Sequence, residues 1–389
     1  MNKPKIRFKG FEGEWNSPSI EKVFEVRNGY TPSKSVESYW IGGTIPWFRM
    51  EDIRASGGFL EDSIQHITPK AVKNNGLFEK NSIIMATTAT IGVHAQLIAD
   101  SLANQRFTNF SIRKSLREGI IAKYVYYAFF GIDEWAVKNT NSGGLLSVNM
   151  PFLLKHPFFV PSLPEQRALA SYFTSLDAQI AASTSRLSSL KQIKAASLLN
   201  MFPQKGEMVP RVRFKGFQGE WKEIKLGEIF SVEIGEFVIK TKQKNNAPYP
   251  VYNGGVSNTG FYDCYNQEGP KIIVSARGAN AGYVNYCTTD FWAGNSCYSI
   301  GAKNNDELKF FFYFLKRFQE IYMKNQYSAS IPSISKQQIL RTNLIYPSLP
   351  EQRAIASYFT ALDAQITLHR ERLEKLKQIK AACLEKMFA

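Results

Sequence analysis

The chain has 389 residues and a formal net charge of +15 at pH 7, and 44% of its residues are hydrophobic. This hydrophobic fraction is enough to fill packed cores, so the composition argues against a largely disordered protein, and the length predicts two domains, or three, rather than one. No run of 18 apolar residues occurs, which excludes a membrane-spanning helix, while the excess of basic residues favours a polyanionic partner, with nucleic acid as the first candidate.

The chain opens on a charged segment, MNKPKIRFKGFEGEW, that lacks an apolar core, so we predict no signal peptide. Ten residues of this opening, Ile6–Trp15, return at Val212–Trp221 with eight identities. A repeat of this kind decides how the rest of the sequence is divided, because each copy is expected to fold in the same way.

A longer repeat lies further along the chain. Pro161–Phe202 returns at Pro347–Phe388 with 30 identities in 42 positions. The chain is therefore two copies of one unit, about 6–202 and 212–388, with a short linker at 203–210 between them. Near-identical ends around divergent middles suggest a fixed frame that carries exchangeable recognition modules.

The two middles retain only a faint likeness. Lys80–Gly92 parallels Pro270–Gly282, and Ala103–Phe107 loosely parallels Gly294–Tyr298. Both middles contain short β-prone runs bounded by turns and one aromatic-rich helix, which indicates a mixed α+β fold. The Tyr and Phe stripes of these helices follow helical spacing and are predicted to be core. We divide the chain into a first globular domain, a first long helix with its linker, a second globular domain and a second long helix, at residues 1–160, 161–210, 211–346 and 347–389.

Polar loops between the β-prone runs are the candidates for contacts with DNA bases. Asn and Gln pair bidentately with adenine, Arg pairs with guanine, and the Thr methyl group packs on thymine. Each loop taken singly is explained equally well as a turn, because Asn and Gly form turns for backbone reasons. The candidate residues are Thr87, Thr88, Thr90, Asn104, Gln105, Arg106, Asn141 and Ser142 in the first middle, and Asn253, Arg277, Asn280, Asn295, Gln326 and Tyr327 in the second.

Each copy of the longer repeat is predicted to be one long helix. Ser162 and Glu165 form an S-x-x-E capping box at its start, and the second copy repeats the pattern. The apolar spacing is typical of a coiled-coil seam, and the approximate two-fold relation of the copies predicts antiparallel packing; two helices docked separately on their own domains are the alternative. The seam residues are Phe173, Leu176, Ile180, Leu187 and Leu190 in the first helix, and Phe359, Leu362, Ile366, Leu373 and Leu376 in the second.

No motif of a catalytic or metal site is found. The sequence contains no G-x-x-x-x-G-K-[ST] phosphate loop, its four histidines lack metal-ligand spacing, and Asn246–Tyr249 lacks the first proline of an N-P-P-Y methyltransferase motif. The four cysteines lie beyond residue 260 without a C-x-x-C pair, which argues against disulfides and zinc and predicts a reducing, cytoplasmic location. We therefore expect a binding protein without metal or catalytic residues.

The chain resembles the specificity (S) subunit of type I restriction–modification systems. The resemblance is carried by the duplicated P-S-L-P-E-Q-R helix start, the L-D-A-Q-I that follows it, the R-F-x-G-F-x-G-x-W opening of each unit and the two divergent middles. The resemblance covers essentially the whole chain. It implies two target recognition domains, each of which reads one half of a split, asymmetric DNA site, separated by two long antiparallel coiled-coil helices that act as spacer and dock.

The resemblance also implies partners. Leu163–Phe202 and Leu349–Phe388, which carry the seam residues, would be the subunit-docking helices, with 6–24 and 212–230 closing the ring between units. Two methyltransferase (modification) subunits would bind S-adenosylmethionine, and restriction/translocase subunits would bind ATP and Mg²⁺, so this chain would hold no cofactor and perform no chemistry. A free-standing tandem-domain DNA-binding regulator and a single-chain enzyme with an unrecognised active site are the alternatives.

Overall fold

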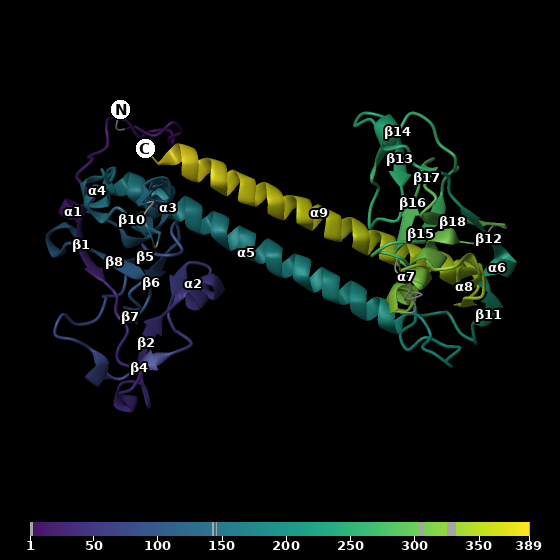
Figure 1. Ribbon diagram of the computed structural model, residues 1–389, viewed down its shortest axis with the longest axis horizontal. Coiled ribbons are helices and arrows are strands. Elements are labelled where there is room, and N and C mark those ends of the chain that lie inside the picture. The colour runs from purple at the N-terminus through teal and green to yellow at the C-terminus, as the bar shows by residue number, and fades with distance from the viewer. Residues whose placement is uncertain (1–2, 142–143, 145, 304–306, 325–331, 389) are drawn as a thin grey trace. The chain divides into compact units, whose positions relative to one another are not determined.

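The computed structural model (Figure 1) describes residues 3–141, 144, 146–303, 307–324 and 332–388. The chain divides into two compact units: unit 1 is Met1–Ser183 with Arg372–Ala389, and unit 2 is Thr184–Glu371. This division differs from the four segments expected from the sequence. Each unit holds one globular domain together with part of both long helices, because the end of each long helix packs on the domain of the other copy.

Unit 1 is built on a five-stranded sheet in the order β1-β8-β5-β6-β3. A three-stranded sheet, β4-β2-β7, and a two-stranded hairpin, β10-β9, accompany it. The strands are β1 (Phe24–Asn28), β2 (Ile45–Phe48), β3 (Phe59–Leu60), β4 (His66–Ile67), β5 (Ile83–Ala86), β6 (His94–Leu97), β7 (Leu102–Ala103), β8 (Phe107–Ile112), β9 (Thr140–Asn141) and β10 (Ser147–Val148). The helices are α1 (Ile20–Val23), α2 (Met50–Ser56), α3 (Ala122–Lys138) and α4 (Met150–Lys155), with short 3₁₀ turns η1 (Glu37–Tyr39), η2 (Pro69–Ala71) and η3 (Lys114–Leu116).

Helix α3 supplies the aromatic face that covers this sheet. The ring of Phe129 lies 5.6 Å from that of Phe24 on β1 and 5.3 Å from that of Phe110 on β8. Tyr124 and Tyr127 of the same helix are also fully buried. The stripe predicted to be core is therefore confirmed as core, and full burial of each large apolar side chain contributes about 1.5–3 kcal/mol.

Unit 2 repeats the central arrangement as β12-β18-β15-β16. It adds the sheets β14-β13-β17 and β11-β19. The strands are β11 (Lys222–Lys225), β12 (Phe230–Ile234), β13 (Tyr249–Tyr252), β14 (Gly260–Tyr262), β15 (Lys271–Ser275), β16 (Val284–Cys287), β17 (Trp292–Ala293), β18 (Cys297–Ala302) and β19 (Asn343–Tyr346). The helices are α6 (Leu226–Ile229), α7 (Leu308–Lys324) and α8 (Lys336–Leu340), with one 3₁₀ turn, η4 (Lys240–Lys242).

The shared strand order confirms that the two middles have a common fold, although the loose sequence parallel is displaced by one residue. Ala86 pairs with Phe107 across β5 and β8, and Ser275 pairs with Cys297 across β15 and β18. Phe107 is therefore the counterpart of Cys297, whereas the sequence parallel matched it to Tyr298. A shift of one residue matters because neighbouring strand residues face opposite sides of a sheet.

The two long helices are α5 (Leu163–Asn200, teal in Figure 1) and α9 (Leu349–Met387, yellow). Within unit 1, the hydroxyl of Tyr172 lies 3.4 Å from Sγ of Cys383, and Asp177 pairs with Lys380 at 2.6 Å. Residue numbers fall along α9 as they rise along α5, so the predicted antiparallel packing is confirmed. Eight of the ten seam residues are buried, and Ile180 and Leu376 are half-buried.

The opening motif of each unit holds the start of a long helix. Arg7 donates to both carboxylate oxygens of Glu165 at 2.7 Å, and its remaining guanidinium hydrogens donate to the backbone carbonyls of Glu12 and Gly13. Trp15 donates from Nε1 to the same carboxylate at 3.2 Å. The Glu165 side chain therefore binds the opening loop instead of completing the predicted capping box.

Unit 2 repeats the arginine contacts with its own residues. Arg213 donates to the two carboxylate oxygens of Glu351 at 2.7 and 2.8 Å, and to the backbone carbonyls of Gln218 and Gly219. The carboxylates of Glu165 and Glu351 are both almost fully buried. A buried charge of this kind is tolerated only when it is paired and hydrogen-bonded, which explains why the two motifs occur together in both copies.

Candidate nucleic-acid interface

Three of the predicted loops of unit 1 meet at the end of the sheet where β5 ends and β8 begins. The backbone N–H of Thr87 donates to the carbonyl of Arg106 at 3.0 Å. On the other side of the same segment, the N–H of Val148 donates to the Thr87 carbonyl and the N–H of Ala89 donates to the Leu146 carbonyl. The loops that follow β5, precede β8 and contain the β9–β10 hairpin therefore form one continuous edge.

Unit 2 assembles the equivalent loops in the same way. The N–H of Ala276 donates to the carbonyl of Ser296 at 2.7 Å, as Thr87 does to Arg106 in unit 1. The N–H of Gly294 donates to the Tyr252 carbonyl, and the N–H of Ile334 donates to the Ala276 carbonyl. We call these two surfaces the loop edges of unit 1 and unit 2. The loop edge of unit 1 is formed by residues 87–90, 104–106, 140–141 and 146–148, and that of unit 2 by residues 252–255, 276–280, 294–296 and 332–334.

A glycine brings the neighbouring strand against each loop edge. Gly29 follows β1, and its N–H donates to the carbonyl of Phe107, the first residue of the neighbouring strand β8. Gly235 follows β12, and its N–H donates to the carbonyl of Cys297, the first residue of the neighbouring strand β18. A Cβ atom on either glycine would collide with the backbone carbonyls of the facing loop. Only glycine permits this close approach of two backbones, so both loop edges depend on the same device.

Four of the predicted DNA-contacting side chains are exposed on the loop edges: Gln105, Arg106 and Asn141 in unit 1 and Arg277 in unit 2. No ion pair or hydrogen bond of the Arg106 or Arg277 guanidinium is found within the part of the chain that the structure describes. An exposed arginine without a carboxylate partner is available for a guanine edge or a phosphate group.

Six further candidates are half-buried, namely Thr88, Thr90, Asn104, Asn253, Asn280 and Asn295. Two of them hold loop backbone with their side-chain oxygens. Oδ1 of Asn104 accepts from the N–H of Arg106 at 3.0 Å, and Oδ1 of Asn253 accepts from the N–H of Ser296 at 3.2 Å. For these two residues the turn-forming explanation is therefore supported by a specific bond.

Thr87 corrects one prediction. Its side chain is buried, with 5% of the residue exposed, and Oγ1 shares a 2.8 Å hydrogen bond with Oγ1 of Thr108 on β8. Thr87 follows β5 directly, and its side chain packs against Thr108 of β8 instead of standing in solvent, so this side chain is not available for a base contact. Ser142, Gln326 and Tyr327 lie outside the residues that the structure describes.

The segment that follows β1 in unit 1 and β12 in unit 2 belongs to the loop edge and was missed from the sequence. In unit 1, Oγ1 of Thr31 donates to Oε1 of Gln105. In unit 2, Glu236 forms a β-bridge with Gly294, which brings the exposed Phe237 beside the 294–296 loop. The signal was an aromatic residue followed closely by Lys240 and Lys242, but an apolar residue next to a strand is normally expected in the core.

The seam residues predicted on the docking helices are mostly unavailable to a partner. Phe173, Leu190 and Phe359 are almost completely buried. Any partner that binds these helices must therefore contact their outward faces, where exposed apolar residues include Ile193 and Leu368. Docking of other subunits on the two helices stays a prediction.

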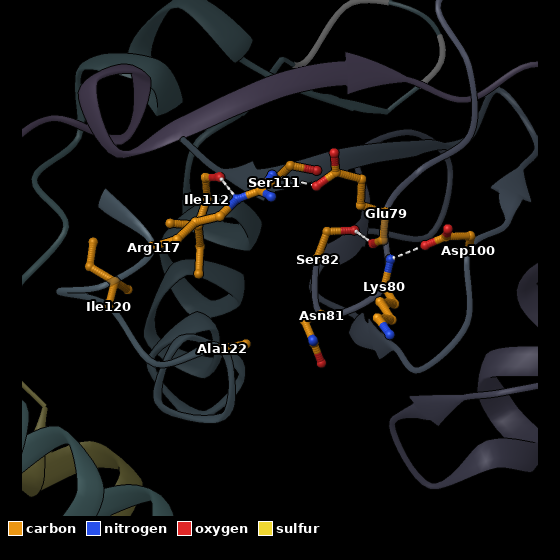
Figure 2. Close-up of a pocket in the computed structure, with 10 residues that line it drawn as sticks. All are labelled: Glu79, Lys80, Asn81, Ser82, Asp100, Ser111, Ile112, Arg117, Ile120 and Ala122. Carbon is orange, nitrogen blue, oxygen red and sulfur yellow. Dashed lines mark hydrogen bonds and ion pairs between the residues drawn. The ribbon is translucent and has the colours of Figure 1, made fainter. Parts of the chain in front are cut away.

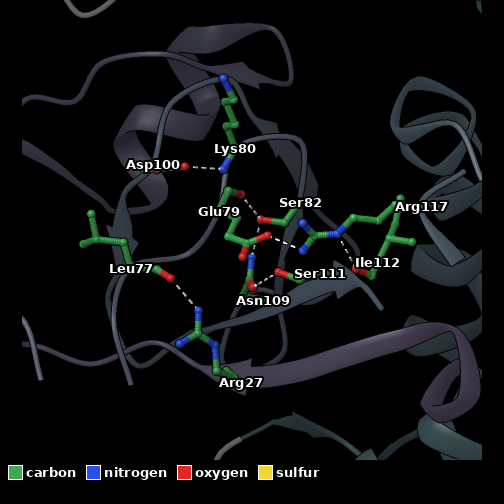
Figure 3. Close-up of polar contacts among 10 residues, drawn as sticks. All are labelled: Arg27, Leu77, Glu79, Lys80, Ser82, Asp100, Asn109, Ser111, Ile112 and Arg117. Carbon is green, nitrogen blue, oxygen red and sulfur yellow. Dashed lines mark hydrogen bonds and ion pairs between the residues drawn. The ribbon is translucent and has the colours of Figure 1, made fainter. Parts of the chain in front are cut away.

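A polar pocket of about 520 Å³ lies at the opposite end of β5 and β8 from the loop edge of unit 1 (Figure 2). Arg117 pairs with Glu79 across it, and Asp100 accepts from the backbone N–H of Lys80 at 2.7 Å. Behind the pocket, Asn109 of β8 donates to Ser82 at 2.8 Å (Figure 3). Among the charged residues that line the pocket, Arg117 and Glu79 pair with each other and Asp100 binds a backbone N–H, so these contacts tie the ends of neighbouring strands together.

Two negative findings limit the chemistry of the described residues. Among them, no group of three or more His, Cys, Asp or Glu side chains is arranged to hold a metal ion. No helix in the described segments is long and apolar enough to cross a membrane.

Comparisons with known proteins agree on one family. The family model for the type I restriction modification DNA specificity domain matches the chain twice, at residues 12–192 and 218–378. The chain is 30% identical to the type I restriction enzyme EcoprrI specificity subunit of Escherichia coli, over 96% of this chain and 92% of that protein. It is 25% identical to the MjaIX specificity subunit of Methanocaldococcus jannaschii, again over 96% and 92%.

A solved structure has the same fold over its full length. The S subunit of a type I restriction-modification system from M. genitalium aligns with 100% of this chain and 99% of its own, with a TM-score of 0.67 and 20% identity. The likeness therefore extends to both units and both long helices.

Proposed function

The chain belongs to the family of type I restriction–modification specificity subunits, and from this premise we propose how its two units read DNA. As a member of this family it is a non-catalytic subunit that supplies DNA sequence specificity through two target recognition domains. In our proposal the loop edge of unit 1 reads one half of a split, asymmetric site, and the loop edge of unit 2 reads the other half.

The observation that carries this proposal is that the two loop edges have equivalent backbone bonds but different side chains. Arg106 stands in unit 1 where Ser296 stands in unit 2, since each accepts the equivalent backbone bond from the facing loop. Ala276 is the counterpart of Thr87, because each donates the equivalent backbone bond. The exposed Arg277 of unit 2 therefore corresponds to Thr88 of unit 1. Equivalent backbones with different donors and acceptors are expected to select different base pairs.

The remaining subunits of the complex are proposed from the family. The relatives are named as specificity subunits of type I restriction enzymes. We infer that two methyltransferase subunits with S-adenosylmethionine dock on the outward faces of α5 and α9, and that restriction/translocase subunits with ATP and Mg²⁺ join them in the cytoplasm. This chain then holds no cofactor of its own.

A selection experiment tests the proposal. The full chain, assembled with its methyltransferase partner, is used to select duplexes from a random-sequence pool. We expect one enriched motif with two short specified parts separated by an unspecified gap of constant length. A continuous motif, or a split motif bound equally tightly by the chain alone, would favour the free-standing regulator, and transfer of methyl groups by the chain alone would favour the single-chain enzyme.

Two matched variants separate base contacts from phosphate contacts. Arg106→Ala is expected to relax one position of one half-site, and Arg277→Ala one position of the other, each with a loss of about 1–3 kcal/mol on the cognate sequence. The measurement is the affinity of each variant for a panel of singly substituted duplexes. A uniform loss on all sequences, with a shallower salt dependence, would instead assign the guanidinium to a phosphate.

A further inference from the structure

Phe237 is the most exposed of the large apolar side chains in the described chain, with 72% of the residue accessible to solvent. It lies between β12 and η4, in a segment where Ile234 and Ile239 are also exposed. Three exposed apolar residues within six positions differ from the single apolar side chains that are common on protein surfaces.

The backbone holds Phe237 in this exposed position from both sides. Before it, the N–H of Gly235 donates to the Cys297 carbonyl at 3.1 Å and the N–H of Glu236 donates to the Ala293 carbonyl at 2.8 Å. After it, Val238 is buried, and the backbone of Ile239 both donates to and accepts from the Tyr262 hydroxyl. The exposure of the ring is therefore built into an anchored segment and is not a property of a free loop end.

The same contacts place Phe237 at the loop edge of unit 2. Glu236 forms a β-bridge with Gly294, so Phe237 follows directly beside the loop that contains Asn295 and Ser296. Gly254 connects this loop to the next, since a Cβ atom there would touch both Ser296 and the backbone of Arg277. Phe237 thus belongs to the loop edge that also presents Arg277.

Unit 1 has a polar residue in the same position. Gly29 and Tyr30 make the backbone bonds that Gly235 and Glu236 make in unit 2, with Phe107 and Ala103 as the partners. Thr31 is therefore the counterpart of Phe237, and it hydrogen-bonds to Gln105 instead of standing free of its loop. The two units differ here in chemistry while sharing the backbone.

We propose that Phe237 reads a thymine in the half-site of unit 2 by packing its ring against the thymine C5-methyl group. In the major groove the edges of base pairs present hydrogen-bond donors and acceptors, and the thymine methyl is their apolar group. A ring on the same loop edge as Arg277 and Asn295 can reach that group while those polar side chains reach neighbouring base edges. The exposed Lys240 and Lys242, which follow Phe237, match the negative charge of the adjacent phosphates.

This inference rests on the proposed function and is tested after it. The full chain with its methyltransferase partner is titrated with cognate duplexes in which each thymine of the unit 2 half-site is replaced by deoxyuridine, which keeps base pairing and removes only the methyl group. For the wild type we expect about a four-fold loss of affinity at one position, the value of one buried methyl group. Phe237→Ala binds the cognate duplex more weakly and no longer distinguishes thymine from deoxyuridine at that position.

The controls separate this contact from general effects. Phe152→Ala removes another exposed phenyl ring, 63% accessible, from unit 1, and should discriminate thymine from deoxyuridine in the unit 2 half-site as the wild type does. Phe237→Leu keeps an apolar contact and should retain part of the discrimination. Both Phe237 variants should melt at the wild-type temperature, because the ring is not part of a core.

The possible outcomes are distinct. A unit 2 half-site without thymine, equal binding of thymine and deoxyuridine duplexes by the wild type, or unchanged discrimination by Phe237→Ala would each overturn the inference. Phe237→Ala could instead bind more weakly while still discriminating thymine from deoxyuridine, with 2-aminopurine fluorescence that reports an unstacked base. This outcome would overturn the methyl contact and indicate that the ring is a wedge between bases. If the wild-type complex selected no split site at all, the proposed function itself would fail.

Discussion

At the scale of single residues, the opening motif of each unit holds a long helix through an equivalent arginine–glutamate pair. Arg7 and Arg213 each form a bidentate ion pair with a glutamate in the first turn of a long helix. Each guanidinium also donates to two backbone carbonyls of its own loop. The tryptophans differ, because Trp15 donates to Glu165 whereas Nε1 of Trp221 has no partner among the described residues. The hydrogen bond with Glu165 raises the pKa of Arg7 above its ordinary value, and the glutamate charge adds to this effect, while burial opposes it. The arginine therefore stays charged wherever the protein is folded.

Loss of one partner is expected to be costly. Arg7→Ala leaves the Glu165 carboxylate buried without its counter-charge, for which we expect a loss of about 3–5 kcal/mol in the free energy of unfolding. Arg211→Ala is the matched control, because its pair with Glu207 is exposed and should contribute little to stability. Urea unfolding of the two variants measures the difference. Equal losses would contradict the role assigned to the opening motif.

Lys316 on α7 predicts a pH dependence. Burial and, to a smaller extent, the charge of Lys194 lower its pKa to about 8 against the opposing effect of Asp363, while Nζ donates to the Val284 carbonyl and to Gln319. The ordinary value is 10.5, so between about pH 8 and pH 10.5 the unfolded chain binds more protons than the folded one. Stability should therefore rise with pH across this window, and the destabilisation by the buried charge of Lys316 is fully present below pH 8.

The variant Lys316→Met removes this contribution. The free energy of unfolding of the wild type, minus that of the variant, should increase between pH 7.5 and pH 10.5 by up to about 3 kcal/mol, reduced by the solvent that reaches the side chain. The measurement is urea unfolding at a series of pH values. Parallel curves for the two proteins would show that Lys316 titrates alike in the folded and unfolded chain.

The candidate site was predicted from the sequence only in part, for reasons visible at single residues. Composition identified the exposed Arg106 and Arg277, because polar loops between strands are rarely buried. It could not separate Thr87 from Thr88, since neighbouring residues of an extended chain face opposite sides and the sequence does not reveal where β5 ends. Phe237 was missed because its exposure depends on backbone bonds to residues about 60 positions away.

At the scale of elements, the aspartate of each L-D-A-Q-I segment joins three helices. Asp177 on α5 accepts from the Tyr127 hydroxyl of α3 at 2.9 Å and pairs with Lys380 of α9. Asp363 on α9 accepts from Tyr313 of α7 at 2.9 Å and pairs with Lys194 of α5. These contacts tie the coiled coil to a globular domain in each unit, which explains why this segment is repeated along with the helix start.

The long helices were predicted closely because their signals are local. An unbroken apolar seam without glycine, and a proline in the first turn, fix a helix and its start within the sequence itself. The antiparallel packing followed from the duplication. The burial of each seam position was beyond prediction, because equivalent leucines of the two copies have the same sequence pattern and differ only in what surrounds them.

The seam is expected to be energetically uneven. Leu190 is 3% exposed, whereas its equivalent in the second copy, Leu376, is only half-buried. Leu190→Ala should therefore cost about 2–5 kcal/mol in the free energy of unfolding, and Leu376→Ala clearly less, since the half-buried site leaves a smaller cavity and already contacts water. Thermal and urea unfolding of the two variants test this order. The same loss in both would mean that the seam is symmetric.

At the scale of the whole molecule, the chain combines two readers with one shared pair of helices. Each unit takes its sheet and loop edge from one copy of the repeat and parts of its helices from both copies. We propose that this arrangement lets one loop edge change without affecting the other. It also explains why the sequence suggested four segments where the packing gives two units.

Exchange of one middle tests this independence. Replacement of residues 25–160 by the corresponding segment of another family member should change one half-site of the selected DNA and leave the other half-site and the gap unchanged. Sequencing of selected duplexes measures all three quantities at once. A change in both half-sites would mean that the two units do not read DNA separately.

The helices are proposed to set the gap between half-sites. Insertion of seven residues at the boundary between units, after Ser183 in α5 and after Glu371 in α9, keeps the heptad pattern and leaves each unit intact. It lengthens each helix by about 10 Å, or roughly three base pairs of duplex. The preferred gap should lengthen while both half-sites stay the same, and an unchanged gap would contradict a spacer role for the helices.

The central claim is that this chain decides which DNA sequence its partner subunits modify. The most direct test is a genome-wide map of methylated adenines in cells that carry the chain together with its methyltransferase partner, compared with cells that carry the partner alone. The account predicts a split, asymmetric methylated motif that appears only when the chain is present. An identical methylation pattern in both cells, with an expressed and active methyltransferase, would contradict it.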